Sequence, residues 1–532
     1  MQKSGKLELT WVGKYEEEKL EPRILVEDKS KSYGDDNTEN ILIYGDNLLA
    51  LKALENDYTE KIKCVYIDPP YNTGSAFESY DDGLEHSIWL GMMKPRLQIL
   101  WNLLTDKNGV LLISVNDDEC HYLKVLCDEL FGRNKFICSL VWNYEGNTDN
   151  QAKIINYHEY ILVYSKTGEL DNLNIIDPNI SNSSKLFNDE IRNTIIKNGP
   201  KNPMKTVHIP KGFPAAFESG IIKKEIVNYP QYDSDIIVNA WKTDNEVNAT
   251  SGWSSKSIFE DFIANDFNSV KDSKKQDTIF ELKVTGAIEA VKKRENDKGH
   301  FISVLRGFGT TNQMRLLLKD MGLKFTYPKP VKLVEYLIKA FTTENDIILD
   351  SFAGSGTTAH AVMELNKKKN SNRKFILIEL QENNANNVIL PRLKYVIDGY
   401  EKAGIEPHDS GFKFYELAEP LLVKNSILPI YQLNPNYTFE MVAEAICKIE
   451  GFKYKTIGEF HGQSSENRFI HVTLEFVNSK YIMSLMKSLG EKQSLLIYCT
   501  KMQGDMNLPE NVEVKKIPKD LLEKCTFESE VE

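Results

Sequence analysis

Short apolar runs alternate with amphipathic stretches over about the first 165 residues of the chain. After the first run, Leu48, Leu51 and Leu54 recur at the spacing of one helix face. The pattern predicts a helix capped by Asn47. Such alternation of strands and helices is typical of a mostly parallel sheet. The predicted strands cover 40–44, 62–67, 110–115, 136–142 and 160–164, and further helices cover 87–104 and 118–131.

The alternation stops at about residue 166 and resumes at about 321. The intervening stretch is rich in Asn, Ser, Lys and Asp, which indicates a less regular inserted domain. Residues 321–404 return to the α/β pattern, with strands predicted at 346–349 and 374–379. Residues 405–532 indicate a smaller mixed α/β domain. The sequence therefore predicts one α/β core in two parts, 1–165 and 321–404, separated by an insert at 166–320.

Composition places the chain among ordinary globular proteins. It has 532 residues, 41% hydrophobic and 27% charged, enough for three or four domains. The net charge of −12 requires that a nucleic-acid-binding surface concentrate its Lys and Arg locally. The seven cysteines form no C-x-x-C pair, so we expect no metal site and a reducing, cytoplasmic compartment. No apolar run approaches 18 residues, so we expect no membrane span.

A glycine-rich turn follows the strand predicted at 346–349. The run ILDSFAGSGTT places glycines between a strand and a helix, where a ligand can approach the backbone closely. Glu379 ends the next strand, 379 − 354 = 25 residues after Gly354, in the position of an acid that binds a ribose. The pair indicates a nucleoside cofactor. A P-loop is excluded by the lack of G-K-[ST], whereas a nicotinamide-dependent oxidoreductase or a ligand-free turn stays possible.

The strand predicted at 62–67 runs directly into Asp68-Pro69-Pro70-Tyr71. The two prolines stiffen this turn and remove two backbone donors, which leaves the Asp68 carboxylate and the Pro69 carbonyl as acceptors. Two acceptors match an amine with two hydrogens. Tyr71 offers a flat face on which a base can stack. The alternative is a rigid loop with a purely structural aspartate.

Together the two turns resemble the amino-methyltransferases of DNA. Their order, DPPY before F-x-G-x-G, is similar to that of the beta class. The flanking sequence resembles the modification subunit of type III restriction–modification systems. The resemblance covers the chain except the insert. It implies a Rossmann-like S-adenosylmethionine-dependent methyltransferase sheet, circularly permuted, with an inserted target-recognition domain and a small α/β C-terminal domain. The stretches that carry it include IYGDNLLALKAL, YIDPPYNTG, HSIWLGMMKPRL, GVLLISVNDDE, HEYILVYSK, YPKPVKLV and FAGSGTT.

The resemblance implies that Asp68 and Gly354 are neighbours and assigns roles to individual residues. The catalytic turn is Asp68, Pro69, Pro70 and Tyr71, which would hold the N6 amine of a flipped-out adenine. Asp46 could accept from the cofactor adenine or only cap a helix, and Glu382 is an alternative to Glu379. His158 is expected to be structural. The implied cofactor-binding residues are Asp46, Lys329, Asp350, Phe352, Gly354, Gly356, Thr357 and Glu379.

The insert is expected to contact double-stranded DNA through basic and aromatic side chains. The implied partners are a second copy of the chain and an ATP-dependent restriction subunit. A cytosine-N4 methyltransferase, an RNA methyltransferase and a non-catalytic recognition subunit stay open as alternatives. The candidate DNA-binding residues are Lys197, Lys201, Lys205, Lys211, Lys292, Lys293, Arg294, Trp241, Trp253 and Phe308.

Overall fold

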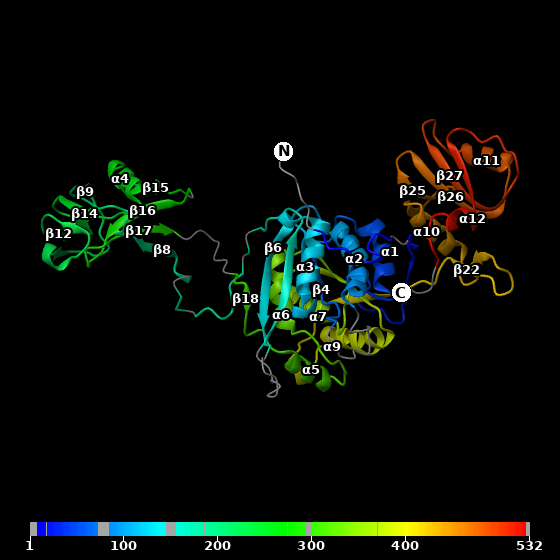
Figure 1. Cartoon of the computed structure of the whole chain (residues 1–532), viewed down its shortest axis with the longest axis horizontal. Coiled ribbons are helices and arrows are strands. Elements are labelled where there is room, and N and C mark those ends of the chain that lie inside the picture. The colour runs from blue at the N-terminus through cyan, green and yellow to red at the C-terminus, as the bar shows by residue number, and fades with distance from the viewer. Residues whose placement is uncertain are drawn as a thin grey trace. The chain divides into compact units, whose positions relative to one another are not determined.

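The protein divides into two compact units (Figure 1). Unit 1 comprises Met1–Leu173 and Ile302–Glu532, and unit 2 comprises Asn174–Phe301. Within the described residues no helix is both long and apolar enough to cross a membrane. The computed structural model describes residues 8–16, 19–72, 85–144, 156–171, 173, 175–181, 183–184, 187–273, 275–293, 301–369 and 371–527.

A large, mostly parallel sheet forms the centre of unit 1. Strand β7 is antiparallel to β5 and β6, and β1 is antiparallel to β21, whereas the strands from β21 to β5 run parallel. In spatial order the strands are β1 (Leu25–Glu27), β21 (Gly411–Leu417), β3 (Ile41–Tyr44), β20 (Lys374–Glu379), β19 (Ile347–Asp350), β4 (Cys64–Ile67), β5 (Val110–Val115), β7 (His158–Ser165), β6 (Phe136–Asn143) and β18 (Val304–Leu305), with β2 (Tyr33–Gly34) beside β21.

Two strands of the second half lie between two strands of the first half. Strands β3 and β4 follow each other in the sequence, yet β20 and β19 separate them in the sheet. Ile376 of β20 pairs with Ile41 of β3, and Ile348 of β19 pairs with Cys64 of β4, both in parallel register. The two halves therefore complete one sheet, as the permuted methyltransferase arrangement predicts.

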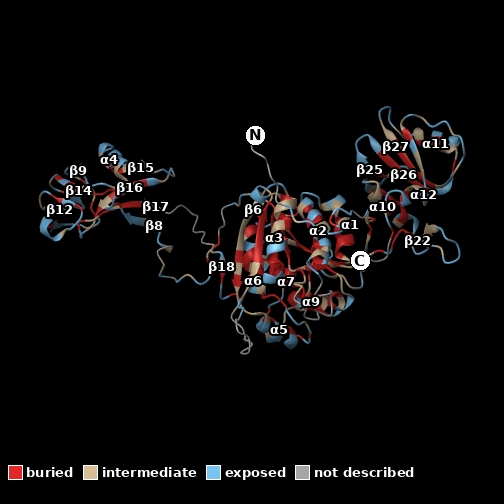
Figure 2. Ribbon diagram, viewed as in Figure 1, coloured by how far each residue is buried: buried red, intermediate tan, exposed pale blue. Residues whose placement is uncertain are grey.

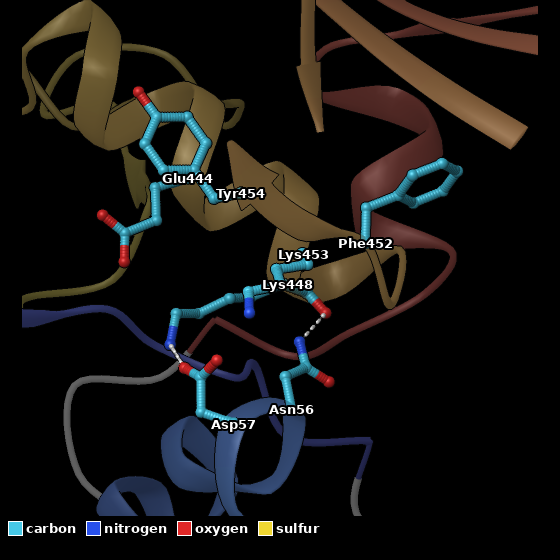
Figure 3. Close-up of a pocket in the computed structure, with 7 residues that line it drawn as sticks. All are labelled: Asn56, Asp57, Glu444, Lys448, Phe452, Lys453 and Tyr454. Atoms are coloured by element: carbon cyan, nitrogen blue, oxygen red, sulfur yellow. Dashed lines mark hydrogen bonds and ion pairs between the residues drawn. The ribbon is translucent and has the colours of Figure 1, made fainter. Parts of the chain in front are cut away.

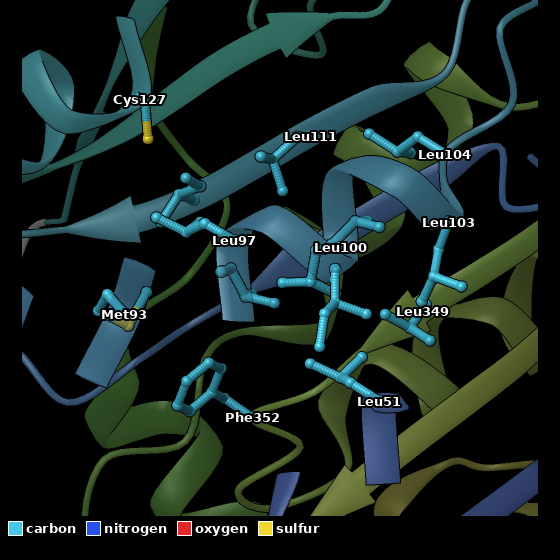
Figure 4. Close-up of a cluster of buried hydrophobic side chains, with 14 of the residues drawn as sticks. Leu51, Met93, Leu97, Leu100, Leu103, Leu104, Leu111, Cys127, Leu349 and Phe352 are labelled. Atoms are coloured by element: carbon cyan, nitrogen blue, oxygen red, sulfur yellow. The ribbon is translucent and has the colours of Figure 1, made fainter. Parts of the chain in front are cut away.

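Helices α1, α2 and α3 bury their apolar side chains against this sheet. Leu51 of α1 and Met93 and Leu97 of α2 belong to one buried cluster with Leu349 and Phe352 from the second half (Figure 4). The central strands of this sheet consist mostly of buried residues (Figure 2). The helices of the core are α1 (Asn47–Tyr58), α2 (His86–Leu103), α3 (Asp117–Phe131), α5 (Thr311–Asp320), α6 (Val331–Phe341), α7 (Thr357–Lys369), α8 (Glu382–Asn384) and α9 (Leu390–Asp398).

Of the two residues that the sequence offers as the cap of α1, Asn47 is wrong and Asp46 is confirmed. Asp46 is the cap, because its carboxylate accepts from the backbone N–H of Leu49 at 2.9 Å. Asn47 is instead the first helical residue and is fully buried. The two adjacent side chains are both good cap formers, and only the backbone conformation at the strand end distinguishes them.

Unit 2 is a set of small antiparallel sheets around an aromatic core. Phe213, Phe259, Phe262 and Phe280 are fully buried in it. The unit is shorter than the predicted insert, because β18 pairs with β6 and so ties the segment after Phe301 to unit 1. Its elements are β8 (Glu190–Thr194), β9 (Lys205–Ile209), β10 (Gly220–Ile222), β11 (Gln231–Tyr232), β12 (Ile236–Asn239), β13 (Lys242–Thr243), β14 (Val247–Ser251), α4 (Lys256–Ala264), β15 (Val270–Lys271), β16 (Asp277–Leu282) and β17 (Ile288–Lys293).

The C-terminal part of unit 1 forms its own mixed sheet with two hydrophobic clusters. Central strands β26 and β27 run parallel. Their apolar side chains pack with α10 in one cluster and with α11 in the other. The elements are β22 (Leu422–Lys424), β23 (Tyr431–Leu433), α10 (Phe439–Ile449), β24 (Lys453–Ile457), β25 (Phe460–Ser465), β26 (Arg468–Val477), α11 (Ser479–Met486), β27 (Ser494–Met502), β28 (Val512–Lys516) and α12 (Lys519–Leu522).

Candidate active site

The two motif-bearing turns leave the same edge of the sheet from neighbouring strands. Strand β4 ends at Ile67 and leads into Asp68, and β19 ends at Asp350 and leads into the glycine-rich turn. Because β4 and β19 pair in parallel register, both turns start at their carboxyl ends. This edge is where open α/β sheets bind ligands. The predicted proximity of Asp68 and the glycine-rich turn is confirmed.

The glycine-rich turn is held by the buried carboxylate of Asp350. Its Oδ1 accepts from the backbone N–H of Phe352 at 3.0 Å, and its Oδ2 accepts from the Thr358 hydroxyl at 2.5 Å. Gly354 and Gly356 have φ values of +55° and +78°, in the region that favours glycine. Burial raises the pKa of Asp350 to about 7. The turn is therefore closed by a carboxyl group that is half protonated near neutral pH.

Glu379 closes the same turn from the end of β20. It is 4% exposed, and its carboxylate accepts from the backbone N–H of Gly354 at 2.8 Å and of Gln381 at 3.0 Å. Burial raises the pKa of Glu379 to about 7, although these hydrogen bonds oppose the shift. The alternative acid, Glu382, is exposed at the start of α8. Of the two, Glu379 is the acid that contacts the glycine-rich turn.

Arg392, a residue that sequence reasoning did not single out, supports the turn from α9. Its side chain is fully buried and donates to the Ser355 carbonyl at 2.8 Å and to the Thr357 hydroxyl at 3.1 Å. Burial lowers the pKa of Arg392 to about 9. Nothing local in the sequence distinguishes this arginine, because its role depends on how α9 packs against α7.

The Asp68 side chain lies in a compact charged cluster with Tyr71, Glu159 and Lys329. Lys329 Nζ lies 2.8 Å from Asp68 Oδ1 and 3.3 Å from Glu159 Oε2. The Tyr71 hydroxyl lies 2.8 Å from Asp68 Oδ1 and 3.0 Å from Glu159 Oε2. Glu159 stands next to His158 in the stretch HEYILVYSK, and sequence reasoning missed it. The neighbouring His158 instead contacts the Tyr160 hydroxyl at 3.0 Å.

Lys329 joins this cluster to the glycine-rich turn. Its Nζ donates to the Tyr71 hydroxyl at 2.7 Å and lies 4.7 Å from the ring centroid, and its carbonyl accepts from the Thr357 hydroxyl at 3.2 Å. Burial acts to lower the pKa of Lys329, but the charges of Asp68 and Glu159 outweigh it and raise that pKa. Burial, and then the same two carboxylates, raise the pKa of Tyr71 well above its usual value. Lys329 is therefore a buried cation matched to two carboxylates.

Hydrogen bonds from Trp89 and Asn72 hold the DPPY turn in shape. Trp89 of α2 is fully buried, and its indole N–H donates to the Pro70 carbonyl at 2.9 Å. Asn72 follows the turn with φ of 60° and donates to the Glu119 carboxylate at 2.6 Å. Pro69 is itself buried. The orientation of the turn is thus fixed from helices α2 and α3.

Asp46 and Asn47 connect the end of β3 to both turns. Asp46 Oδ2 lies 3.7 Å from the guanidinium of Arg96, and Asn47 Oδ1 accepts from Arg96 Nε at 2.6 Å. The Asn47 amide also donates to the Ser351 carbonyl at 3.0 Å. Asp46 is therefore a helix cap beside the candidate site, and Asn47 links the first half of the core to the glycine-rich turn of the second.

The basic candidates in the insert are mostly solvent-facing, whereas the aromatic ones are mostly buried. Trp253 is 5% exposed in the core of unit 2, and Phe308 is 4% exposed and belongs to unit 1. Trp241 is 54% exposed with φ of 64° in the turn between β12 and β13. Lys292 pairs with Asp272, and Arg294 lies outside the described residues. The exposed basic candidates are Lys197, Lys201, Lys205, Lys211 and Lys293.

A separate pocket of about 150 Å³ lies where α1 meets the C-terminal sheet domain (Figure 3). Lys448 of α10 donates to the Ala53 carbonyl at 3.0 Å and lies 4.0 Å from Asp57. None of the predicted site residues lines this pocket. Its lining, which marks the contact between domain and core, is Asn56, Asp57, Glu444, Lys448, Phe452, Lys453 and Tyr454.

The fold and the site define a class of α/β protein in which a glycine-rich turn and a proline-stiffened carboxylate turn follow neighbouring parallel strands. The sequence model described as DNA methylase, of the N6/N4 type, matches residues 62–389. The matched region contains both turns and the whole of unit 2. The chain belongs to this DNA methylase family.

Individual relatives are similar over most of the chain. It is 32% identical to the type III restriction–modification enzyme EcoPI Mod subunit of Escherichia phage P1, covering 70% of this chain and 63% of that subunit. It is 29% identical to the EcoP15I Mod subunit of Escherichia coli, covering 78% and 72%. Among solved structures, the PvuII cytosine-N4-specific DNA methyltransferase matches 69% of this chain and 90% of that chain at 14% identity and a TM-score of 0.34. The chain thus spans less than two thirds of the EcoPI subunit.

Proposed function

We propose that this protein transfers a methyl group from S-adenosylmethionine to the N6 amine of adenine in double-stranded DNA. One observation carries the proposal: the Asp68 turn and the glycine-rich turn leave neighbouring parallel strands, and Lys329 contacts both. An amine held at Asp68 is then close to a cofactor held at the glycine-rich turn. Such positioning is the main contribution an enzyme makes when the methyl donor is already reactive.

The residues around the glycine-rich turn fit S-adenosylmethionine. Buried Glu379 and the capping carboxylate Asp46 offer acceptors for ribose hydroxyls and an adenine amine. The buried Ser351 hydroxyl makes no hydrogen bond among the described residues, which leaves a polar group for a ligand. When bound, the cofactor supplies a methyl group whose carbon–sulfur bond breaks as the amine nitrogen bonds to the carbon, the electron pair staying on sulfur and one amine proton passing to solvent. The proposed set is Asp46, Asp350, Phe352, Gly354, Gly356, Thr357 and Glu379.

On the acceptor side, Asp68 and the Pro69 carbonyl hold the two amine hydrogens. Because Trp89 occupies the Pro70 carbonyl, the Pro69 carbonyl is the proline acceptor left for the amine. Hydrogen bonds that strengthen as the nitrogen becomes tetrahedral stabilise the transition state more than the ground state. One face of Tyr71 is covered by Lys329, and a flipped-out base stacks on the other.

The similarity to type III Mod subunits extends the proposal to the biological system. The chain acts as the modification subunit of such a system, recognises DNA through unit 2, pairs with a second copy, and associates with an ATP-dependent restriction subunit. The exposed lysines of unit 2 support phosphate contact. The seven free cysteines suit a reducing cytoplasm.

The test is methyl transfer by the purified chain. Radiolabelled S-adenosylmethionine is incubated with duplex DNA, and the hydrolysed product is analysed for N6-methyladenine and N4-methylcytosine. Sequencing of host DNA with and without the gene identifies the methylated site. Label in N4-methylcytosine, or label transferred only to RNA, contradicts the proposal.

Replacing Asp68 by Ala is expected to slow methyl transfer by about 10³-fold or more, because the acceptor for the target amine is lost. Calorimetric binding of S-adenosylmethionine is expected to stay within about threefold of the wild-type value, since Asp68 lies on the acceptor side. Near-normal turnover by this variant would refute the assigned mechanism.

A further inference from the structure

All three hydrogens of the Lys329 ammonium are directed at the acceptor half of the site. Its nitrogen lies 2.8 Å from Asp68 Oδ1, 2.7 Å from the Tyr71 hydroxyl and 3.3 Å from Glu159 Oε2. An ammonium has three N–H donors and no acceptor. Three oxygens therefore use its full capacity, and none is left over for a carboxylate of the cofactor.

The contacts of Asp68 are divided unequally between its two oxygens. Oδ1 receives both Lys329 and the Tyr71 hydroxyl, each at 2.8 Å. Oδ2 makes no hydrogen bond with any residue that the structure describes. Two donors on one oxygen fix the rotation of the carboxylate. The other oxygen is then available to the target amine.

Glu159 supplies the second negative charge of the cluster. Its Oε2 lies 3.3 Å from Lys329 Nζ and 3.0 Å from the Tyr71 hydroxyl, and its side chain is 17% exposed. Two carboxylates and one ammonium leave the cluster with one net negative charge. A negative cluster beside an amine that becomes positive during methyl transfer stabilises that charge.

We propose that Lys329 and Glu159 form a positioning pair for the methyl-accepting site: Lys329 orients Asp68 so that Oδ2 faces the target amine, and Glu159 holds Lys329 in that place. The pair rests on the proposed function. It differs from the role that the family resemblance implies for Lys329, which is cofactor binding. The two roles predict different results when Lys329 is replaced: a positioning role leaves cofactor affinity unchanged, whereas a cofactor-binding role weakens it.

The experiment compares Glu159→Gln, Lys329→Gln and the double variant in the full chain. Cofactor affinity is measured by calorimetry with S-adenosylmethionine, and methyl transfer by single-turnover rates on a duplex that carries the site methylated in host DNA. Each single variant is expected to slow transfer by about tenfold or more while the Kd for S-adenosylmethionine stays within about twofold. The double variant is expected to transfer methyl groups at a rate within about twofold of the slower single variant, since both changes disrupt the same Lys329–Glu159 pair.

Two further variants separate positioning from general damage. Glu159→Asp keeps the charge and is expected to recover part of the rate lost in Glu159→Gln. Glu129→Gln removes a carboxylate of similar burial that pairs with Lys14 at 2.6 Å at the far end of α3, and it is expected to leave the transfer rate unchanged. Wild-type cofactor affinity also shows that a variant is folded.

Specific outcomes overturn the inference without touching the proposed function. A Lys329→Gln variant that binds S-adenosylmethionine tenfold more weakly, yet transfers at the wild-type rate at saturation, places Lys329 on the donor side. Independent, multiplying defects in the double variant show that the residues do not act as a pair. By contrast, a wild-type chain that methylates no DNA overturns the proposed function itself.

Discussion

Two carboxyl groups, Asp350 and Glu379, are buried under the glycine-rich turn. Burial raises the pKa of each to about 7, against 3.8 and 4.5 for the exposed groups. The folded chain therefore keeps protons that the unfolded chain releases between about pH 4 and 7. The stability that these protons contribute is full below about pH 4 and is lost as the pH rises through 7.

Replacing Asp350 by Asn is expected to flatten this pH dependence. The amide oxygen can accept from the Phe352 N–H, and the amide nitrogen can donate to the Thr358 hydroxyl, which then accepts instead of donating. The turn therefore keeps both hydrogen bonds. Relative to wild type, the variant is expected to gain on the order of 2 kcal/mol in unfolding free energy between pH 5 and 8. Urea unfolding at both pH values measures it. An unchanged slope would show that Asp350 is ionised throughout.

At the residue scale, sequence motifs predict the groups that follow a strand directly and miss those that depend on packing. Asp68 and Glu379 were identifiable because each ends an apolar run with a chemically distinctive side chain. Glu159 and Arg392 stand among ordinary helix and strand positions, and their partners lie 88 and 37 residues away in the sequence. No local pattern encodes such partners.

Helix α2 stabilises the DPPY turn through a single hydrogen bond from its first turn. The indole of Trp89 donates to the Pro70 carbonyl, and the ring is fully buried under the turn. A carbonyl left without this donor would be free to turn toward solvent or toward the target base. Helix α2 therefore helps to position the acceptor site although it contributes no residue to the DPPY or glycine-rich turn.

Trp89→Phe is expected to cost about 1–3 kcal/mol in unfolding free energy, because the Pro70 carbonyl loses its donor and the smaller ring leaves space. Single-turnover methyl transfer is expected to fall by about tenfold with cofactor affinity unchanged. Trp101→Phe on the same helix is the control, since Trp101 stacks on Phe131 of α3 at 4.2 Å. Equal transfer rates in both variants would exclude a role for the Trp89 hydrogen bond.

The sequence predicted strands correctly where a segment is mostly apolar. The core strands at 62–67, 110–115 and 374–379 agree with β4, β5 and β20 to within two residues, since apolar residues dominate each of them. Unit 2 gave no such signal. Its strands are as short as Lys242–Thr243, alternate only briefly, and take their order from long-range pairing.

The division into two units predicts that the core folds without the insert. Each unit has its own hydrophobic cluster, and unit 1 contains both turns of the candidate site. A chain in which residues 174–301 are replaced by a flexible Gly-Ser linker is expected to bind S-adenosylmethionine within about threefold of the full chain. Sequence-specific DNA methylation is expected to be lost. Calorimetry and sequencing of the treated DNA measure the two results.

The matched control is unit 2 expressed alone, which is expected to bind duplex DNA and no cofactor. Retention of the original methylation site by the shortened chain would place sequence recognition in unit 1. Loss of cofactor binding in a shortened chain that is folded would show that the insert completes the donor site.

The interleaving of β20 and β19 between β3 and β4 constrains how the protein can be made. A ribosome completes β4 while β19, the strand that pairs with it, is still about 280 residues from synthesis, as 347 − 67 = 280, and β20 follows later. Until they emerge, β3 and β4 have a gap between them that neither can close, and the nascent chain exposes two unpaired apolar edges. Premature termination between Tyr71 and Glu379 would therefore leave a fragment that carries the whole DPPY turn but lacks strands of the sheet that supports it, and such a fragment is expected not to methylate.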